Sequence, residues 1–296
     1  MPGIGPRTAA RALRRFGSAG AVLASSDPVL ARALGVDVAR LKAIRSGVSR
    51  GAVRRDLRSL SSLGGTAVFA GHPKYPLPWR GMDDPPVVVR CLGDLDCLVA
   101  RPCVSIVGSR RASSVGIDLA TRFCRAFIDA GWTVCSGGAR GIDAAVHRAC
   151  LRSGGRTIVV LGSGLSCPYP PEHASLFDDV VESGGLVMSE FPCAAAPRPA
   201  HFPVRNRIVA GLSVGVLLVE AGPRSGALIT GRLAVEDYGR ELLAIPGRAD
   251  RDTSAGCHRA VREGWAMLVD EPGQALEHLS SQAGLIGLYG LPGRGD

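Results

Sequence analysis

The sequence lacks the patterns that mark several common classes of protein. Its nine cysteines include no Cys-x-x-Cys pair, and their number is odd, so we expect reduced thiols and neither a disulfide framework nor a metal site. No apolar run approaches the roughly 18 residues that a membrane span needs, and no signal peptide is recognisable. These absences predict a cytoplasmic protein without a membrane partner.

Two nucleotide-binding signatures are also missing. A P-loop is absent, and Gly108 is followed directly by Ser109 and Arg110 instead of by the spacing of a dinucleotide fingerprint. The histidines form no recognisable catalytic triad, and His147 lies where a buried structural histidine is expected. We therefore expect no cofactor.

Lysine is scarce throughout, with Lys42 and Lys74 the only two, and acidic residues are scarce at the N-terminus. Residues 1–58 hold 12 of the 35 basic residues but three of the 26 acidic ones. The remaining 23 basic and 23 acidic residues balance, so this segment carries the whole net charge of +9. A basic segment beside a neutral domain favours a polyanionic partner, although arginine that merely solubilises helices would give the same composition.

The chain is long enough for a large core, and its few aromatics (5%) and 39 glycines suit a sheet with many tight turns. From residue 104 onward, short apolar strands alternate with helical patterns. The predicted strands are 104–107, 132–136, 157–162, 186–190, 214–219, 241–245 and 266–269. This alternation predicts an α/β fold: an extended Rossmann-like, doubly wound, mostly parallel sheet.

Three segments are expected. Residues 1–60 are expected to form a small α-helical domain of the helix-hairpin-helix or SAM-like type. Its hairpin is expected at Gly3 to Pro6, without the helix that normally precedes such a hairpin. Residues 61–275 form the Rossmann-like domain, in which prolines place strand 86–92 at a sheet edge. Residues 276–296 are expected to be a flexible tail.

Residues 134–143 (Val-Cys-Ser-Gly-Gly-Ala-Arg-Gly-Ile-Asp) join a strand to a helix through glycines. Unpaired amides at such a helix N-terminus, together with Arg140, favour a phosphate. The glycines could instead serve packing alone. Further loops at strand ends carry Ser109, Arg110 and Arg111 after the first strand and residues 162–164 after the third. Because the carboxyl ends of parallel strands meet at one edge, these loops predict a common anion site.

The most specific stretch is residues 201–212, where Phe202 precedes Arg205 and Arg207. An aromatic ring beside two cations is what a single-stranded nucleic acid requires, with Arg198 as a further phosphate contact. Phe202 could alternatively pack into the core under the proline-rich loop.

Several motifs in order resemble the DNA-processing protein A (DprA, or Smf) family. They are residues 104–110 (Val-Ser-Ile-Val-Gly-Ser-Arg), 136–143, 202–212, 225–230 (Ser-Gly-Ala-Leu-Ile-Thr), 74–76 (Lys-Tyr-Pro) and 246–247 (Pro-Gly). The resemblance spans roughly residues 3–272. It implies a dimer with an extended Rossmann domain that binds incoming single-stranded DNA in natural transformation, protects it and helps to load the recombinase RecA, without catalysis.

The resemblance also implies a DNA-binding pocket. By motif it assigns Arg110, Arg140, Phe202, Arg205 and Arg207 to the pocket, with Ser163 and Gly164 lining it. The further candidate contacts are Ser109, Arg111, Gly138, Arg198 and Asn206. The chain departs from the family at Pro199, where members often have Lys, which leaves Arg198 as the substitute. Because few residues follow Pro272, we do not expect the winged helix that many members carry.

An enzyme remains the alternative. Rossmann relatives that hydrolyse nucleoside monophosphates to base and ribose phosphate place a carboxylate at a strand end, and Glu220 could act there as general acid or base. Against this reading, the loop after Glu220 runs Ala-Gly-Pro-Arg-Ser-Gly and lacks the Gly-Gly-x-Gly-Thr cradle of those enzymes.

Overall fold

The computed structural model describes residues 5–46 and 50–286, and these residues form one nine-stranded sheet in the order β1-β2-β6-β5-β4-β3-β7-β8-β9. Strands β3 to β9 pair with one another in parallel, whereas β2 pairs antiparallel with both β6 and β1. The strands are β1 Thr66–Phe69, β2 Val88–Gly93, β3 Cys103–Val107, β4 Thr133–Ser136, β5 Thr157–Val160, β6 Leu186–Ser189, β7 Gly215–Leu218, β8 Glu241–Ala244 and β9 Met267–Leu268. The predicted fold class is confirmed.

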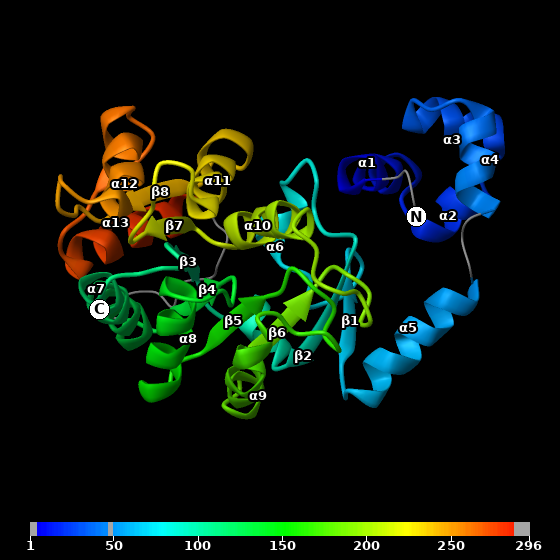
Figure 1. Ribbon diagram of the computed structural model, residues 1–296. Coiled ribbons are helices and arrows are strands. Elements are labelled where there is room, and N and C mark those ends of the chain that lie inside the picture. The colour runs from blue at the N-terminus through cyan, green and yellow to red at the C-terminus, as the bar shows by residue number, and fades with distance from the viewer. Residues whose placement is uncertain (1–4, 47–49, 287–296) are drawn as a thin grey trace, which may run out of the picture.

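Helices cover both faces of this sheet (Figure 1). Every residue of β3 to β7 is buried, as expected of parallel strands between two helical layers. The α-helices of this domain are α6 Leu77–Arg80, α7 Ser114–Asp129, α8 Ile142–Arg152, α9 Ala174–Glu182, α10 His201–Leu212, α11 Gly226–Arg232, α12 Asp252–Arg262 and α13 Pro272–Ile286. Short 3-10 turns at Leu95–Leu98 and Pro171–His173 and a π-helical turn at Leu233–Asp237 complete them.

The order of strands reverses at β3, which lies between β4 and β7. The crossovers after β3 lead away through β4, β5 and β6, and those after β7 lead the other way through β8 and β9. Loops on the two sides of such a reversal separate and leave a crevice at the carboxyl ends of the strands. The fold therefore places its main binding crevice between the loops that follow β3 and β7.

The expectation that strand 86–92 lies at an edge is wrong. β2 pairs with β1 on one side and β6 on the other, so β1 is the edge strand. Pro85 and Pro86 precede the first paired residue of β2, so their missing N–H groups cost the sheet nothing.

The described N-terminal residues form five helices: α1 Pro6–Phe16, α2 Ala19–Ala24, α3 Asp27–Leu34, α4 Val38–Ser46 and α5 Arg50–Ser62. Buried Ala12, Leu30 and Leu41 belong to a small core of their own. Figure 1 shows α1 to α4 as a separate cluster beside the sheet domain. Arg14 of α1 links this cluster to the sheet domain, because its Nη1 donates to the carbonyl of Met82 at 3.2 Å. The predicted hairpin glycine Gly3 lies outside the described residues.

The flexible tail expected from residue 276 is a helix as far as Ile286, since α13 spans Pro272–Ile286. Its buried residues Ala275, Leu279 and Ala283 recur every four positions and belong to the main core. This spacing in the sequence indicates a helix, but the glycines that follow it favoured the prediction of a flexible tail.

Candidate nucleic-acid interface

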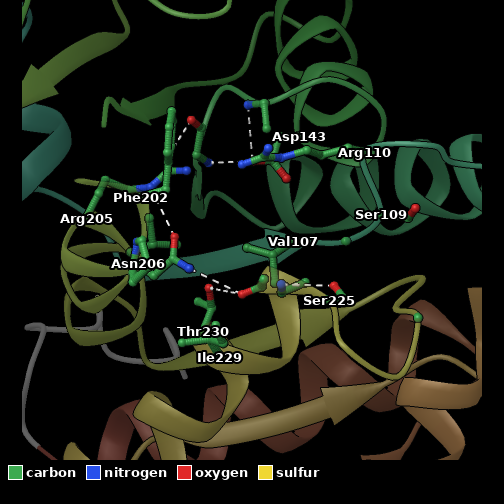
Figure 2. Close-up of a pocket in the computed structure, with 18 of the residues that line it drawn as sticks. Val107, Ser109, Arg110, Asp143, Phe202, Arg205, Asn206, Ser225, Ile229 and Thr230 are labelled. Carbon is green, nitrogen blue, oxygen red and sulfur yellow. Dashed lines mark hydrogen bonds between the residues drawn. The ribbon is translucent and has the colours of Figure 1, made fainter. Parts of the chain in front are cut away.

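A cleft of about 650 Å³ opens at the strand-order reversal, lined by the loops after β3, β4 and β7 and by α10 and α11. Figure 2 shows Phe202, Arg205 and Asn206 of α10 together on one side of this cleft, with Ile229 and Thr230 of α11 next to Asn206. A volume of this size is in the range of small-ligand and cofactor sites.

Arg205 forms part of the base of the cleft. Its side chain is buried, and its Nη1 donates to the carbonyl oxygens of Gly137 and Val160 at the ends of β4 and β5. Burial lowers the pKa of this guanidinium, and the nearby Asp143 carboxylate opposes that shift. Arg205 thus holds strand ends and α10 together.

Asp143, in the first turn of α8, accepts hydrogen bonds from the amides of Gly137 (3.1 Å) and Ala139 (3.3 Å). Burial raises the pKa of this carboxyl, while Arg205 and the amides lower it. From the sequence, amides of this turn are expected to be open to a phosphate. Two of them instead bind the protein's own carboxylate, because the acidic side chain sits within one helical turn of the loop.

Cationic and aromatic side chains alternate along one rim of the cleft. The guanidinium carbon of Arg110 lies 5.3 Å from the ring centroid of Phe202, and the Phe202 and Tyr169 ring centroids are 5.6 Å apart. The guanidinium carbon of Arg140 lies 6.0 Å from the Tyr169 ring. We call these four residues the cation–aromatic row. Each of them is at least partly exposed, so the row offers π-faces and positive charge to the same ligand.

Arg140 at the end of this row also pairs with Glu172, its Nε lying 2.5 Å from Oε1. Both side chains are about half exposed, at 50% and 48%. A hydrogen bond from its own backbone and the Arg140 guanidinium both lower the pKa of Glu172. The glutamate therefore occupies a position beside Arg140 that a phosphate would need.

The part of the cleft wall formed by Asn206 and the start of α11 is neutral. Ser225 caps α11 by accepting from the amide of Ala227 at 3.0 Å, and Asn206 Nδ2 donates to the Gly226 carbonyl at 3.2 Å. Asn206 Oδ1 accepts from Arg205 Nε at 3.2 Å, so this amide joins α10 to α11. The positive charge of the cleft therefore comes from the side that carries the cation–aromatic row.

A family profile described as DNA recombination-mediator protein A matches residues 66–280. The chain belongs to this family. Protein Smf of Escherichia coli K12 is 42% identical over 218 residues, which are 74% of this chain and 56% of that protein. The chain spans about half the length of such curated relatives, 50% of the Smf protein of a Synechocystis strain.

Solved structures of DprA proteins are also similar. The X-ray structure of DprA from Streptococcus pneumoniae superposes with a TM-score of 0.81 at 32% identity, covering 93% of each chain. A structure that concerns the single-stranded DNA binding mode of DprA from Helicobacter pylori gives a TM-score of 0.66 at 25% identity, covering 73% of this chain and 96% of that one. The DprA family resemblance drawn from the motifs is confirmed.

The structure brings most of the candidate DNA contacts to the cleft of this DprA-family protein. Seven lie in its wall or in the adjoining hollow: Ser109, Arg110, Arg111, Arg140, Phe202, Arg205 and Asn206. Ser109 Oγ accepts from the amide of Arg111 at 3.1 Å and shapes its loop. Tyr169 lies among them, although no motif in the sequence indicates it. Its signal, an aromatic closely following a loop at a strand end, is too common to stand out.

Five candidates lie elsewhere. Arg207 points away from the cleft, where its guanidinium bonds the carboxylate of Glu190 and the carbonyl of Asp84. Its side chain is 5% exposed, because α10 turns by about 100° per residue and position 207 faces the sheet interior. The expected role of Arg207 in binding DNA is not supported by this geometry.

The other four are glycine, serine and arginine positions around the cleft. Ser163 and Gly164 do not line it, since Ser163 is fully buried and a side chain at position 164 would collide with the carbonyls of Pro192 and Cys193. Gly138 has φ +70° and packs on Val159 and Phe177. Arg198 is exposed beyond the rim of the cleft. Gly138 therefore serves close packing, which was the alternative interpretation of the glycines in residues 134–143, and Gly164 serves close packing in the loop after β5.

Glu220, the carboxylate that an enzyme would require, has both oxygens engaged. They accept from Ser113 N at 2.9 Å and Ser113 Oγ at 2.6 Å, while Ser113 caps α7. A side chain at Gly116 would collide with this carboxylate. Glu220 therefore ties the loop after β3 to the end of β7.

No cluster of three or more metal-ligating side chains occurs within residues 5–46 and 50–286. Over the same described residues, none of the helices is long and apolar enough to cross a membrane.

Proposed function

We propose that this protein binds single-stranded DNA in the cleft, with a base stacked on Phe202 and Tyr169 and phosphates held by Arg110, Arg111 and Arg140. The observation that carries the proposal is the cation–aromatic row. Exposed rings suit unpaired bases, because bases in a duplex are already stacked on one another. Several arginine–phosphate contacts make affinity fall steeply with salt.

Membership of a recombination-mediator family supports the wider proposal. In it, the protein protects single strands taken up in natural transformation and helps to load RecA onto them, acting as a homodimer. The DprA protein of H. pylori, whose single-stranded DNA binding mode has been studied, supports the choice of ligand. The engagement of Glu220 by Ser113 supports a binding role over hydrolysis of nucleotides.

The test is fluorescence anisotropy with labelled oligo-dT and a duplex of the same length over a salt series. We expect tighter, salt-dependent binding of the single strand and no release of base from nucleoside monophosphates. Phe202→Ala is expected to weaken binding by about fivefold or more, the effect of losing one stacked base. Phe69→Ala removes an exposed ring from edge strand β1 and serves as the matched control.

Equal binding of single strand and duplex, or unchanged affinity in Phe202→Ala, would overturn the proposed site. Turnover of a nucleoside monophosphate would overturn the non-enzymatic proposal. RecA loading is tested separately by strand exchange on DNA coated with a single-strand binding protein, and the dimer by light scattering of the purified chain.

A further inference from the structure

A second pair of rings lies next to the cleft. Phe191 follows β6, and its ring is stacked on that of His201, with centroids 4.1 Å apart and planes 20° from parallel. Both side chains keep part of their surface exposed. Neither residue belongs to the cation–aromatic row, and the proposed function makes no use of them.

The position of this pair follows from the sheet. β6 is the neighbour of β5, and the chain after β5 carries Gly162, against which Phe202 packs. Adjacent strands are about 4.8 Å apart, and His201 directly precedes Phe202 in the first turn of α10. The two stacking surfaces therefore lie side by side at the same edge of the sheet, joined by one helical turn.

The segment that carries Phe191 is held firmly. The amide of Phe191 donates to Ser189 Oγ at 3.1 Å, and that hydroxyl donates to the carbonyl of Ser163 at 2.6 Å. Arg90 Nη1 donates to the carbonyl of Glu190 at 2.8 Å. A ring fixed in this way loses little conformational freedom when a ligand stacks on it.

The charge around the pair suits an anion. The guanidinium of Arg198, three residues before His201, is exposed and makes no hydrogen bond or ion pair within the described residues. The nearby carboxylates are engaged, since Glu190 bonds Arg207 and Asp56 bonds Arg90. An incoming phosphate would meet an unpaired cation there.

We propose that Phe191, His201 and Arg198 form a second nucleotide subsite, in which a base stacks on the ring pair and the adjoining phosphate pairs with Arg198. A strand bound in the cleft then continues across the carboxyl end of β6. This inference rests on the proposed function and extends the same site by at least one nucleotide.

The test compares oligo-dT lengths from about 4 to about 16 nucleotides, the range that single-strand binders span per module. In His201→Ala, the shortest oligomers that bind are expected to keep wild-type affinity, while longer ones lose about fivefold or more. Arg198→Ala is expected to lower the slope of log affinity against log salt by about one, for long oligomers only. His201→Phe keeps a stacking ring and should bind as wild type.

Arg152→Ala is the matched control for charge, since Arg152 is exposed in the last turn of α8, away from the carboxyl ends of the strands. Unchanged affinity of His201→Ala for long oligomers would overturn the subsite, as would an equal loss at every length. Failure of the proposed function looks different: the wild type would not prefer single strands at all, or Phe202→Ala would bind them normally. Thermal unfolding of each variant shows that it is folded.

Discussion

The guanidinium of Arg205 fills the space that a side chain at Gly137 would need, and it donates a hydrogen bond to the Gly137 carbonyl. The motif on α10 supplies the cation, and the glycine of the motif after β4 leaves the space that this cation occupies. The glycine after β4 and the arginine on α10 are parts of a single buried contact that closes the base of the cleft.

Gly137→Ala should therefore damage both stability and binding. The added methyl group collides with a buried guanidinium that donates two hydrogen bonds to carbonyl groups. Overpacking of this kind costs about 1–3 kcal/mol. Urea unfolding measures the loss, and oligo-dT affinity measures the displacement of α10. Gly273→Ala, where a side chain meets open space, is the control and should unfold at the wild-type midpoint or above it. A wild-type midpoint for Gly137→Ala would contradict the contact.

Arg207→Met should destabilise the fold without weakening DNA binding directly. It leaves the largely buried Glu190 carboxylate without its cation, and breaking a buried pair costs about 3–5 kcal/mol. Burial already raises the pKa of Glu190, and Arg207 opposes that shift. Adding Glu190→Leu to Arg207→Met should restore part of the stability. If the single variant folds normally but loses oligo-dT affinity, Arg207 contacts DNA as the motif first indicated.

Arg140 and Glu172 should have opposite effects on binding. Arg140→Ala removes a phosphate contact and should lower the salt slope by about one. Glu172→Gln removes the carboxylate that competes with phosphate for Arg140, and should tighten binding at low salt. Both side chains are half exposed, so neither change should move the unfolding midpoint appreciably. Weaker binding by Glu172→Gln would show that the glutamate positions Arg140 for the ligand.

His147 should make stability fall as the pH is lowered. Burial, with nearby His173 and Arg205, lowers its pKa to about 3, so the folded protein keeps it neutral. Thr157 Oγ1 donates to the Val134 carbonyl and accepts from His147 Nδ1, so the proton of the neutral ring lies on Nδ1. Unfolding lets the ring take up a proton below its ordinary pKa of about 6.5.

The stabilisation is therefore complete above about pH 6.5 and declines toward pH 3, by at most about 1.4 kcal/mol per pH unit. Urea unfolding at pH 7 and pH 5 measures this decline. His147→Asn keeps a donor to Thr157 but does not titrate, so its stability should change less between the two pH values. An equal change in both proteins would assign the pH dependence to other groups.

Local patterns in the sequence were sufficient to predict the strands, most of the helices and the parallel pairing of the sheet. Apolar runs of four to six residues alternating with helical periods specify parallel strands, and parallel strands bring their carboxyl ends to one edge. That is why loops as distant as those carrying Arg110, Arg140 and Phe202 could be expected to meet. The order of the strands, and hence the reversal at β3, depends on pairing between distant segments and came from the structure.

The direction in which each side chain points required the tertiary structure. Arg205 and Arg207 stand two residues apart in one motif, yet one forms the wall of the cleft and the other faces Glu190 behind it. Asp143 accepts hydrogen bonds from amides that were expected to bind phosphate. Tyr169 joins the cation–aromatic row from a position in the loop after β5 that no motif marks. The sequence by itself determined the fold class, the family and the edge of the sheet where the site lies, because local periodicity and motif order carry them. Which charges face a ligand and which hold the protein together was decided by long-range packing, because burial and pairing depend on residues far away in the chain.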